Sequence, residues 1–226
     1  MTEAAKTGLG LMAFWADIDP AHALGYQQWH NCEHIPERVM IPGFREGRRY
    51  RALSNEPHFL MMYETDTTNI LASAAYLAAL NKPTDWTREA LTYFRNPVRS
   101  VYSLIGLAGR PGPFAAPYVT SLRFDLPEGE NGLYQTGWLA SIASITGVER
   151  VRLYRADDAV GKIETSERKI YGGGPGQQAY LALIEQSTAP SPTLGLGSTF
   201  PRTNEQYGTY WLEMAYRSPS PMIVET

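Results

Sequence analysis

The histidines of this chain are confined to one stretch. All four, His22, His30, His34 and His58, lie within the first 58 of its 226 residues. Trp29-His30-Asn31-Cys32-Glu33-His34-Ile35-Pro36-Glu37-Arg38 is the segment richest in reactive side chains. On a helix, His30 and His34 share a face, with Glu33 beside them. Because a histidine changes charge near neutral pH, this segment is the first candidate for an active site.

Three interpretations of these residues compete. His-x-x-Glu-His is the inverted zinc-peptidase pattern, with two histidine ligands and a glutamate base. Pro36 would end the helix at once, however, and only His58 follows to complete a metal site, so we expect no metal. We favour acid–base catalysis, with His30 or His34 as base, the other histidine or His58 as acid, and Glu33 orienting an imidazole. In the third interpretation the histidines only pack at a helix end.

Aromatic residues make up 12% of the chain and could line a pocket for a planar apolar ligand. A substrate carboxylate could pair with an arginine of the same region. Each of these residues also has a structural interpretation, as core or as a surface ion pair. The expected substrate-binding residues are Trp15, Trp29, Arg48, Tyr50, Tyr63 and Trp86.

The elements that position these residues follow from hydrophobic pattern and capping signals. Asp19-Pro20 is typical of a helix start, and this helix should run to about His34. A second helix is expected at 70–80, with Thr84 capping a third. The expected strands are 9–18, 44–53, 59–65 and 99–105. This β-α-β-β-α-β order predicts a ferredoxin-like unit over residues 1–106.

The order then begins again after a Gly-, Pro- and Ala-rich linker at 107–117. Arg48-Arg49-Tyr50-Arg51-Ala52 resembles Arg152-Leu153-Tyr154-Arg155-Ala156, and Ile41-Pro42-Gly43-Phe44 resembles Ile145-Thr146-Gly147-Val148. We therefore expect a second, degenerate unit over 118–226. Its strands should be 118–126, 148–156, 179–187 and 207–217, with a helix at 132–144.

Two such units predict an α+β fold in which the two sheets pack together as a barrel. We expect the ligand cavity between the inner faces of the sheets. The second unit holds no histidine. Residues present in one unit only, such as His30, His34, His58 and Tyr63, are therefore the better candidates for function.

Composition narrows the classes of function. The formal net charge of −3 gives no general attraction to nucleic acid or to an anionic membrane. One cysteine, Cys32, excludes an internal disulfide. Without a signal-like N-terminus or a long apolar run, we expect a cytoplasmic protein.

Trp29-His30-x-x-Glu33-His34-x-Pro36-Glu37-Arg38, followed by Pro42-Gly43-Phe44, resembles the EthD-like branch of the dimeric α+β barrel superfamily. The likeness covers about residues 9–105 and is weak beyond them. It implies the barrel fold, but leaves the reaction open among lactone isomerases, polyketide cyclases, quinone-forming monooxygenases and haem-binding branches.

The resulting expectation is a cofactor-independent isomerase, lyase or cyclase that moves protons on a small aromatic or cyclic metabolite. No cofactor is expected, with haem or a metal as lesser alternatives. A non-catalytic ligand- or haem-binding accessory protein and a cofactor-free monooxygenase are the alternative functions. The expected partner is the small-molecule substrate, and a homodimer is a possible assembly.

Overall fold

The computed structural model describes residues 9–54, 57–112, 115–129, 135–190, 196 and 200–219. Its strands form one closed barrel, in the order β1-β3-β2-β8-β5-β7-β6-β4, and every neighbouring pair is antiparallel. The strands are β1 (Gly10–Ile18), β2 (Phe44–Ala52), β3 (Phe59–Thr65), β4 (Phe94–Gly109), β5 (Tyr118–Asp125), β6 (Val148–Ala156), β7 (Tyr180–Gln186) and β8 (Thr203–Arg217).

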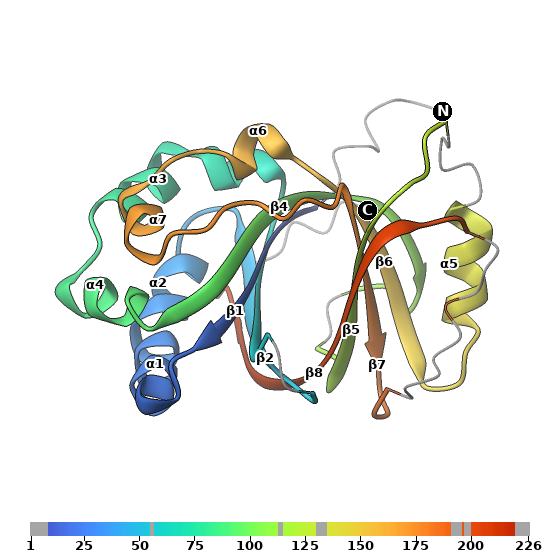
Figure 1. Ribbon diagram of the computed structural model, residues 1–226, viewed down its shortest axis with the longest axis horizontal. Coiled ribbons are helices and arrows are strands. Elements are labelled where there is room, and N and C mark those ends of the chain that lie inside the picture. The colour runs from blue at the N-terminus through green and yellow to red at the C-terminus, as the bar shows by residue number, and fades with distance from the viewer. Residues whose placement is uncertain are drawn as a thin grey trace.

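The helices cover the barrel unevenly. Most of them gather on one side of it, and α5 lies alone on the opposite side (Figure 1). No described helix is long and apolar enough to cross a membrane. The helical segments are η2 (Pro20–His22), α1 (Ala23–Trp29), η3 (His30–His34), α2 (Ile35–Val39), η4 (Thr68–Ala72), α3 (Ala74–Asn81), α4 (Asp85–Leu91), α5 (Gln135–Ala143), α6 (Asp158–Gly161) and α7 (Ser166–Tyr171).

The two halves of the barrel have matching strand orders, β4-β1-β3-β2 and β8-β5-β7-β6, joined where β2 pairs with β8 and β6 with β4. The echoed turns match as well. Gly43 and Gly147 have φ of +89° and +86°, a backbone conformation in which a side chain would be strained. Their carbonyls accept from the amides of Asp66 and Ser187 in the same way. The sequence echoes therefore correspond to equivalent positions in the fold.

The expectation of a ligand cavity between the inner faces of the sheets is wrong. Buried side chains fill the barrel interior, among them Trp15, Tyr50, Tyr102, Tyr154 and Tyr210. Each sheet has hydrophobic side chains on both faces, as the sequence predicts. The side chains on the inner faces are bulky enough to pack against one another across the barrel, so they occupy the space expected for a ligand. The described cavity that holds the histidines lies outside the barrel, under the helices of the first half.

Buried ion pairs cross the barrel interior between the two halves. Arg48 pairs with Glu64 of its own half and with Glu185 of the other, 3.1 Å away. Arg152 does the reverse, lying 2.6 Å from Glu64 and 3.0 Å from Glu185. Burial alone would raise the pKa of Glu185, but the surrounding guanidinium groups hold it at about 2. These ion pairs link the two halves. Arg48 therefore binds buried carboxylates of the protein itself and not the expected substrate.

Several elements differ from the sequence expectation. The expected helix at 70–80 is divided at Ser73, whose backbone is extended, into η4 and α3. Pro36 does not end the first helix, because η3 is a π-helical turn in which Ile35 N–H bonds to His30 O; Pro36, which has no N–H, then enters the first turn of α2. Strand β4 starts at Phe94 and runs to Gly109, into the expected linker 107–117, because Leu107–Gly109 pairs with Arg150–Arg152 of β6. The insertion between β6 and β7 forms α6 and α7, which the sequence did not predict.

Candidate active site

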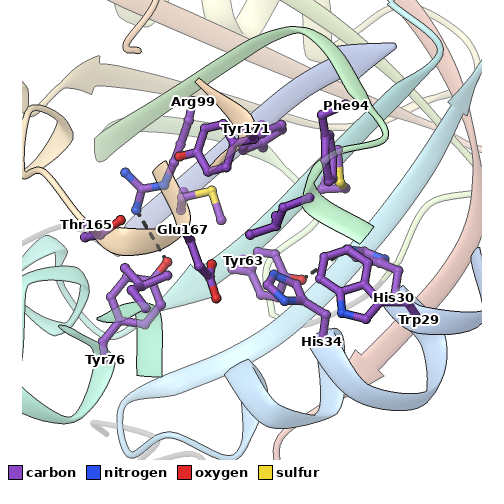
Figure 2. Close-up of a pocket in the computed structure, with 15 residues that line it drawn as sticks. Trp29, His30, His34, Tyr63, Tyr76, Phe94, Arg99, Thr165, Glu167 and Tyr171 are labelled. Carbon is purple, nitrogen blue, oxygen red and sulfur yellow. Dashed lines mark hydrogen bonds between the residues drawn. The ribbon is translucent and has the colours of Figure 1, made fainter. Parts of the chain in front are cut away.

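The site is a cavity between the first half of the barrel and the helices that cover it. His30, His34, Trp29 and Tyr63 gather at one end of the cavity, Tyr76, Arg99 and Tyr171 at the other, with Glu167 between them (Figure 2). Apolar side chains form the rest of the wall: Met12, Phe14, Met61, Leu80, Leu91 and Phe94.

The π-turn places both histidines against the cavity. The ring of His30 is 1% exposed, and its centroid lies 5.6 Å from that of His34. Trp29 packs on the His34 ring at 4.4 Å, and its indole N–H donates to Thr87 on α4. The widened turn and the end of α1 therefore present three side chains, Trp29, His30 and His34, to the cavity, which fits the frequent use of such turns at functional sites.

Hydrogen bonds fix the tautomer of His30. Nδ1 lies 3.2 Å from Nη1 of Arg49, a group that can only donate, so Nδ1 is the acceptor. In the neutral ring the proton is then on Nε2, 3.2 Å from the Tyr63 hydroxyl. The Tyr63 oxygen accepts a hydrogen bond from that N–H group. The Tyr63 hydroxyl is therefore free to donate its own hydrogen bond into the cavity. Burial and the Arg49 charge lower the pKa of His30 well below its usual value, so the ring stays neutral.

His34 is the free base of the site. Its Nδ1 is buried and has no hydrogen-bond partner among the described residues. Burial, followed by the charge of Arg38 and the neighbouring His30 ring, lowers the pKa of His34 well below its usual value. A neutral imidazole with an unpartnered nitrogen in a cavity can accept a proton from a bound molecule or coordinate a metal centre.

The second half of the chain adds a carboxyl group to the site. Glu167, on α7, is 3% exposed and forms an ion pair with Arg38 of α2. Burial raises the pKa of Glu167 to about 7, against the opposing effect of Arg38. Near neutral pH this carboxyl group can therefore either donate or accept a proton.

Arg99 and Tyr76 form the opposite end. Arg99 on β4 pairs in register with Phe14 on β1, so its side chain shares the helix-facing side of the sheet. Nη2 of Arg99 donates to the Tyr76 hydroxyl at 3.4 Å, and Tyr171 closes the wall beside them. Burial raises the pKa of Tyr171 to about 12, so it stays protonated.

The structure brings together only part of the set of residues expected from the sequence. His30, His34, Trp29 and Tyr63 line the cavity. Trp15, Arg48 and Tyr50 lie inside the barrel instead, because they fall on the other face of their strands. Trp86 is 40% exposed on α4 and does not line the cavity.

Glu33 does not orient an imidazole. Its carboxylate accepts from the hydroxyls of Thr84, at 2.6 Å, and Thr87, at 2.8 Å. Glu33 thereby ties the π-turn to the start of α4 and, through Thr87, supports the Trp29 indole. It is a positioning residue at one remove from the cavity.

His58 lies outside the cavity, on an open groove with Arg51 and Ser54. Its backbone amide donates to Oδ1 of Asp17, whose Oδ2 accepts from Asn96. The second half repeats this arrangement without a histidine: Ala179 N and Asn204 donate to the two oxygens of Asp125. The amide contact at His58 is therefore a backbone feature of the fold. The His58 ring lies on the open groove, with Nδ1 3.6 Å from Oδ1 of Asp17 and away from the cavity, so the expected acid role has no geometric support.

Sequence reasoning missed Arg99, Tyr76, Thr165, Glu167 and Tyr171. A signal existed for Arg99, since it alternates with Val101 on the apolar face of its strand, where a charge is out of place. No local signal marks Glu167, because the insertion that carries it reaches the site only through tertiary packing.

No family model and no curated protein matches the sequence. Solved structures match it over nearly its whole length. An anthrone oxidase-like protein aligns with a TM-score of 0.60 at 9% identity, over 97% of each chain. A candidate monooxygenase from Fusobacterium nucleatum aligns with a TM-score of 0.58 at 6% identity, over 93% of this chain and 95% of the other.

Two further neighbours correct the expectation that no cofactor is involved. A candidate chlorite dismutase aligns with a TM-score of 0.54 at 10% identity, over 91% of this chain and 95% of the other. A haem-binding protein from Thermus thermophilus aligns with a TM-score of 0.50 at 8% identity, over 91% of each chain. The same barrel thus occurs in a haem-binding protein, so the fold gives no ground for expecting the absence of a cofactor.

The residues present suit that group in one respect. Haem needs an axial donor, and His34 offers a buried ring nitrogen without a partner, whereas both nitrogens of His30 are engaged. At these identities the likeness establishes the fold, and the chain is an α+β barrel protein of the architecture shared by these neighbours.

Proposed function

We propose that the cavity belongs to an oxygen-dependent enzyme of the monooxygenase type, acting on a planar phenolic aromatic. One observation carries the proposal: a neutral, unpartnered base, His34, faces a hydroxyl donor, Tyr63, in a buried aromatic cavity. The anthrone oxidase-like and monooxygenase neighbours support oxidation over the isomerase, lyase or cyclase chemistry expected from the sequence.

The proposed chemistry starts with proton removal. His34 takes a proton from an activated CH₂ or phenol of the substrate, while Tyr63 donates a hydrogen bond to the oxygen on which charge develops. Oxygen then oxidises the electron-rich anion. For a CH₂ group converted to a ketone, the substrate supplies the electrons, so that R₂CH₂ + O₂ gives R₂C=O + H₂O.

Oxygen uptake tests this function. Anthrone and 1,8-dihydroxyanthrone serve as probes, because each has an acidic CH₂ whose oxidation gives a coloured quinone. We expect oxygen consumption coupled to quinone formation in the wild type and its loss in His34→Ala, with His58→Ala as the matched control. Wild-type uptake no faster than in buffer alone, or uptake in His34→Ala equal to that of the wild type, would rule the function out.

Haem binding is the second candidate, favoured by the same unpartnered nitrogen of His34. Bound haem would supply redox chemistry at iron, and His34 is the residue that would hold it. Titration with haemin should then give a shifted Soret band that His34→Ala abolishes and His58→Ala keeps. A spectrum identical to that of free haemin would exclude this candidate.

We infer that the two halves are copies of one ferredoxin-like unit, residues 1–106 and 118–226, of the EthD-like kind. The matched strand orders, glycine turns and aspartate contacts support this. Since one chain closes the barrel, a homodimer would join barrels through their outer surfaces.

A further inference from the structure

Arg99 is a buried cation on the wall of the cavity. It is 9% exposed, and its backbone N–H is bonded to Gly174 O, which holds β4 in place at this point. Its side chain lies at the end of the cavity opposite His30 and His34 (Figure 2). A guanidinium is always charged in a protein, so this end of the cavity carries a fixed positive charge.

Other buried arginines have carboxylate partners. Arg49 lies 2.8 Å from Glu213, and Arg38 and Arg48 pair with Glu167 and Glu64. Arg99 has none: across the described part of the chain no carboxylate lies within ion-pairing distance of it, and its recorded side-chain hydrogen bond is the 3.4 Å contact to Tyr76. Arg123, the other buried arginine without a carboxylate, packs instead on the face of Trp15, 4.3 Å from the ring centroid.

The groups around Arg99 do not cancel its charge. Tyr76 from α3 and Tyr171 from α7 bring hydroxyl groups, not carboxylates, and Phe14 from β1 is apolar. Glu167 also faces the cavity, but its carboxyl group is bound by Arg38, so this pair contributes no net negative charge. An unpaired charge in an apolar cavity is costly, and a ligand anion is the missing partner.

The Tyr76 hydroxyl indicates which kind of anion this end of the cavity binds. Its oxygen accepts from Arg99, so its own proton can donate to the same ligand. Together the two side chains offer guanidinium N–H groups and one hydroxyl toward the cavity, a set that suits the two oxygens of a carboxylate.

From this geometry we propose that the ligand of the cavity is an aromatic carboxylate. Its carboxylate binds Arg99 and Tyr76, and its ring system extends between the apolar walls toward His34 and Tyr63. This deepens the proposed function, on which it rests for the identity of the reacting end. A carboxylate could come from a small aromatic acid or from a haem propionate, and the experiment separates these sources.

Equilibrium binding tests the proposal without any turnover. The probes are 2-naphthoate, its neutral amide 2-naphthamide, and haemin compared with its dimethyl ester. We expect at least one acid to bind the wild type ten-fold or more tightly than its neutral counterpart. Arg99→Met should abolish that preference, and Arg99→Lys should retain part of it by keeping the charge. Arg95→Met is the matched control, since Arg95 lies on the same strand with an exposed side chain.

Preference for 2-naphthoate identifies a small aromatic acid as the ligand, and preference confined to haemin identifies the propionate. Equal binding of acid and neutral probes to the wild type, binding of none of them, or a preference that survives in Arg99→Met would overturn the proposal. Thermal melting of the variants shows that they are folded. Failure of the oxygen-uptake experiment alone leaves this binding result standing, so the two proposals fail separately.

Discussion

The Tyr63 hydroxyl and Nε2 of His30 lie 3.2 Å apart, and tyrosine is the acceptor of this bond because Arg49 donates to the other ring nitrogen. The direction of the bond gives His30 and Tyr63 different tasks. His30 donates a hydrogen bond to the Tyr63 oxygen and so fixes its position. The Tyr63 hydroxyl can then donate to a ligand in the cavity. Burial raises the pKa of Tyr63 well above its usual value, so the proton is retained at any working pH.

Tyr63→Phe should therefore lower turnover by about 100-fold or more, the range typical of one acid–base group. The same change leaves Nε2–H of His30 without an acceptor, which should lower the free energy of unfolding by about 1–3 kcal/mol. Oxygen uptake and urea unfolding measure the two effects. Tyr93→Phe, which removes an exposed hydroxyl bonded to Glu89, is the control and should change neither. Full turnover in Tyr63→Phe would show that the hydroxyl is not the donor.

The buried histidines should make stability depend on pH. Because the pKa values of His30 and His34 are lowered in the folded state, the unfolded chain binds more protons once pH falls below about 6.5. Each histidine then lowers the free energy of unfolding by about 1.4 kcal/mol per pH unit as pH falls. Unfolding measured between pH 5 and 6 should have a slope about 1.4 kcal/mol per unit smaller in His34→Gln than in the wild type. An unchanged slope would mean that His34 is protonated in the folded protein.

Glu167 acts in the opposite sense. Its pKa is raised from 4.5 to about 7, so the folded state binds the extra proton between these values and loses stability as pH rises through them. Glu167→Gln cannot titrate, and it also leaves Arg38 without its partner. The variant should be the less stable protein at pH 4.5, and the difference should shrink by roughly 3 kcal/mol by pH 8. Unfolding curves at these two pH values provide the measurement, and a gap that widens with pH contradicts the raised pKa.

Much of the scaffold could be predicted because its signals are local. Asp19 and Thr84 cap their helices, accepting from Ala21 N and Thr87 N, and β3 and β6 occupy the expected ranges. The site could be predicted only where one segment carries it, at Trp29, His30 and His34. Which face of a strand lines the cavity depends on which of its two alternating sets of side chains packs against the other half of the barrel. Arg48 and Tyr50 belong to the set that packs against the other half, so they lie inside the barrel. The position of Glu167 depends on how the insertion packs against helices far away in the sequence.

The ion pairs inside the barrel should be needed for stability and not for ligand binding. Arg48→Met leaves Glu64 and Glu185 short of one cation in a buried setting, which should lower the free energy of unfolding by about 3–5 kcal/mol. The affinity for the cavity probes should stay the same, since Arg48 lies on the other face of the sheet. Arg45→Met removes the half-exposed pair with Asp66 and should cost about 1 kcal/mol or less. A loss of probe binding in folded Arg48→Met would show that Arg48 contributes to ligand binding.

The contact between His58 and Asp17 has an equivalent in the second half, between Ala179 and Asp125, which allows a direct comparison. Asp17 is bound by the backbone amide of His58 at 2.9 Å, and Asp125 by that of Ala179 at 2.7 Å. The His58 ring adds only a half-exposed contact of 3.6 Å between Nδ1 and Asp17 Oδ1, so His58→Ala should change the free energy of unfolding by no more than about 0.5 kcal/mol and leave turnover intact. Asp17→Ala and Asp125→Ala each remove an acceptor from two donors, and each should cost about 1–3 kcal/mol. If His58→Ala lost turnover while Asp17→Ala kept it, the imidazole would have a catalytic role that its position on the outer groove does not explain.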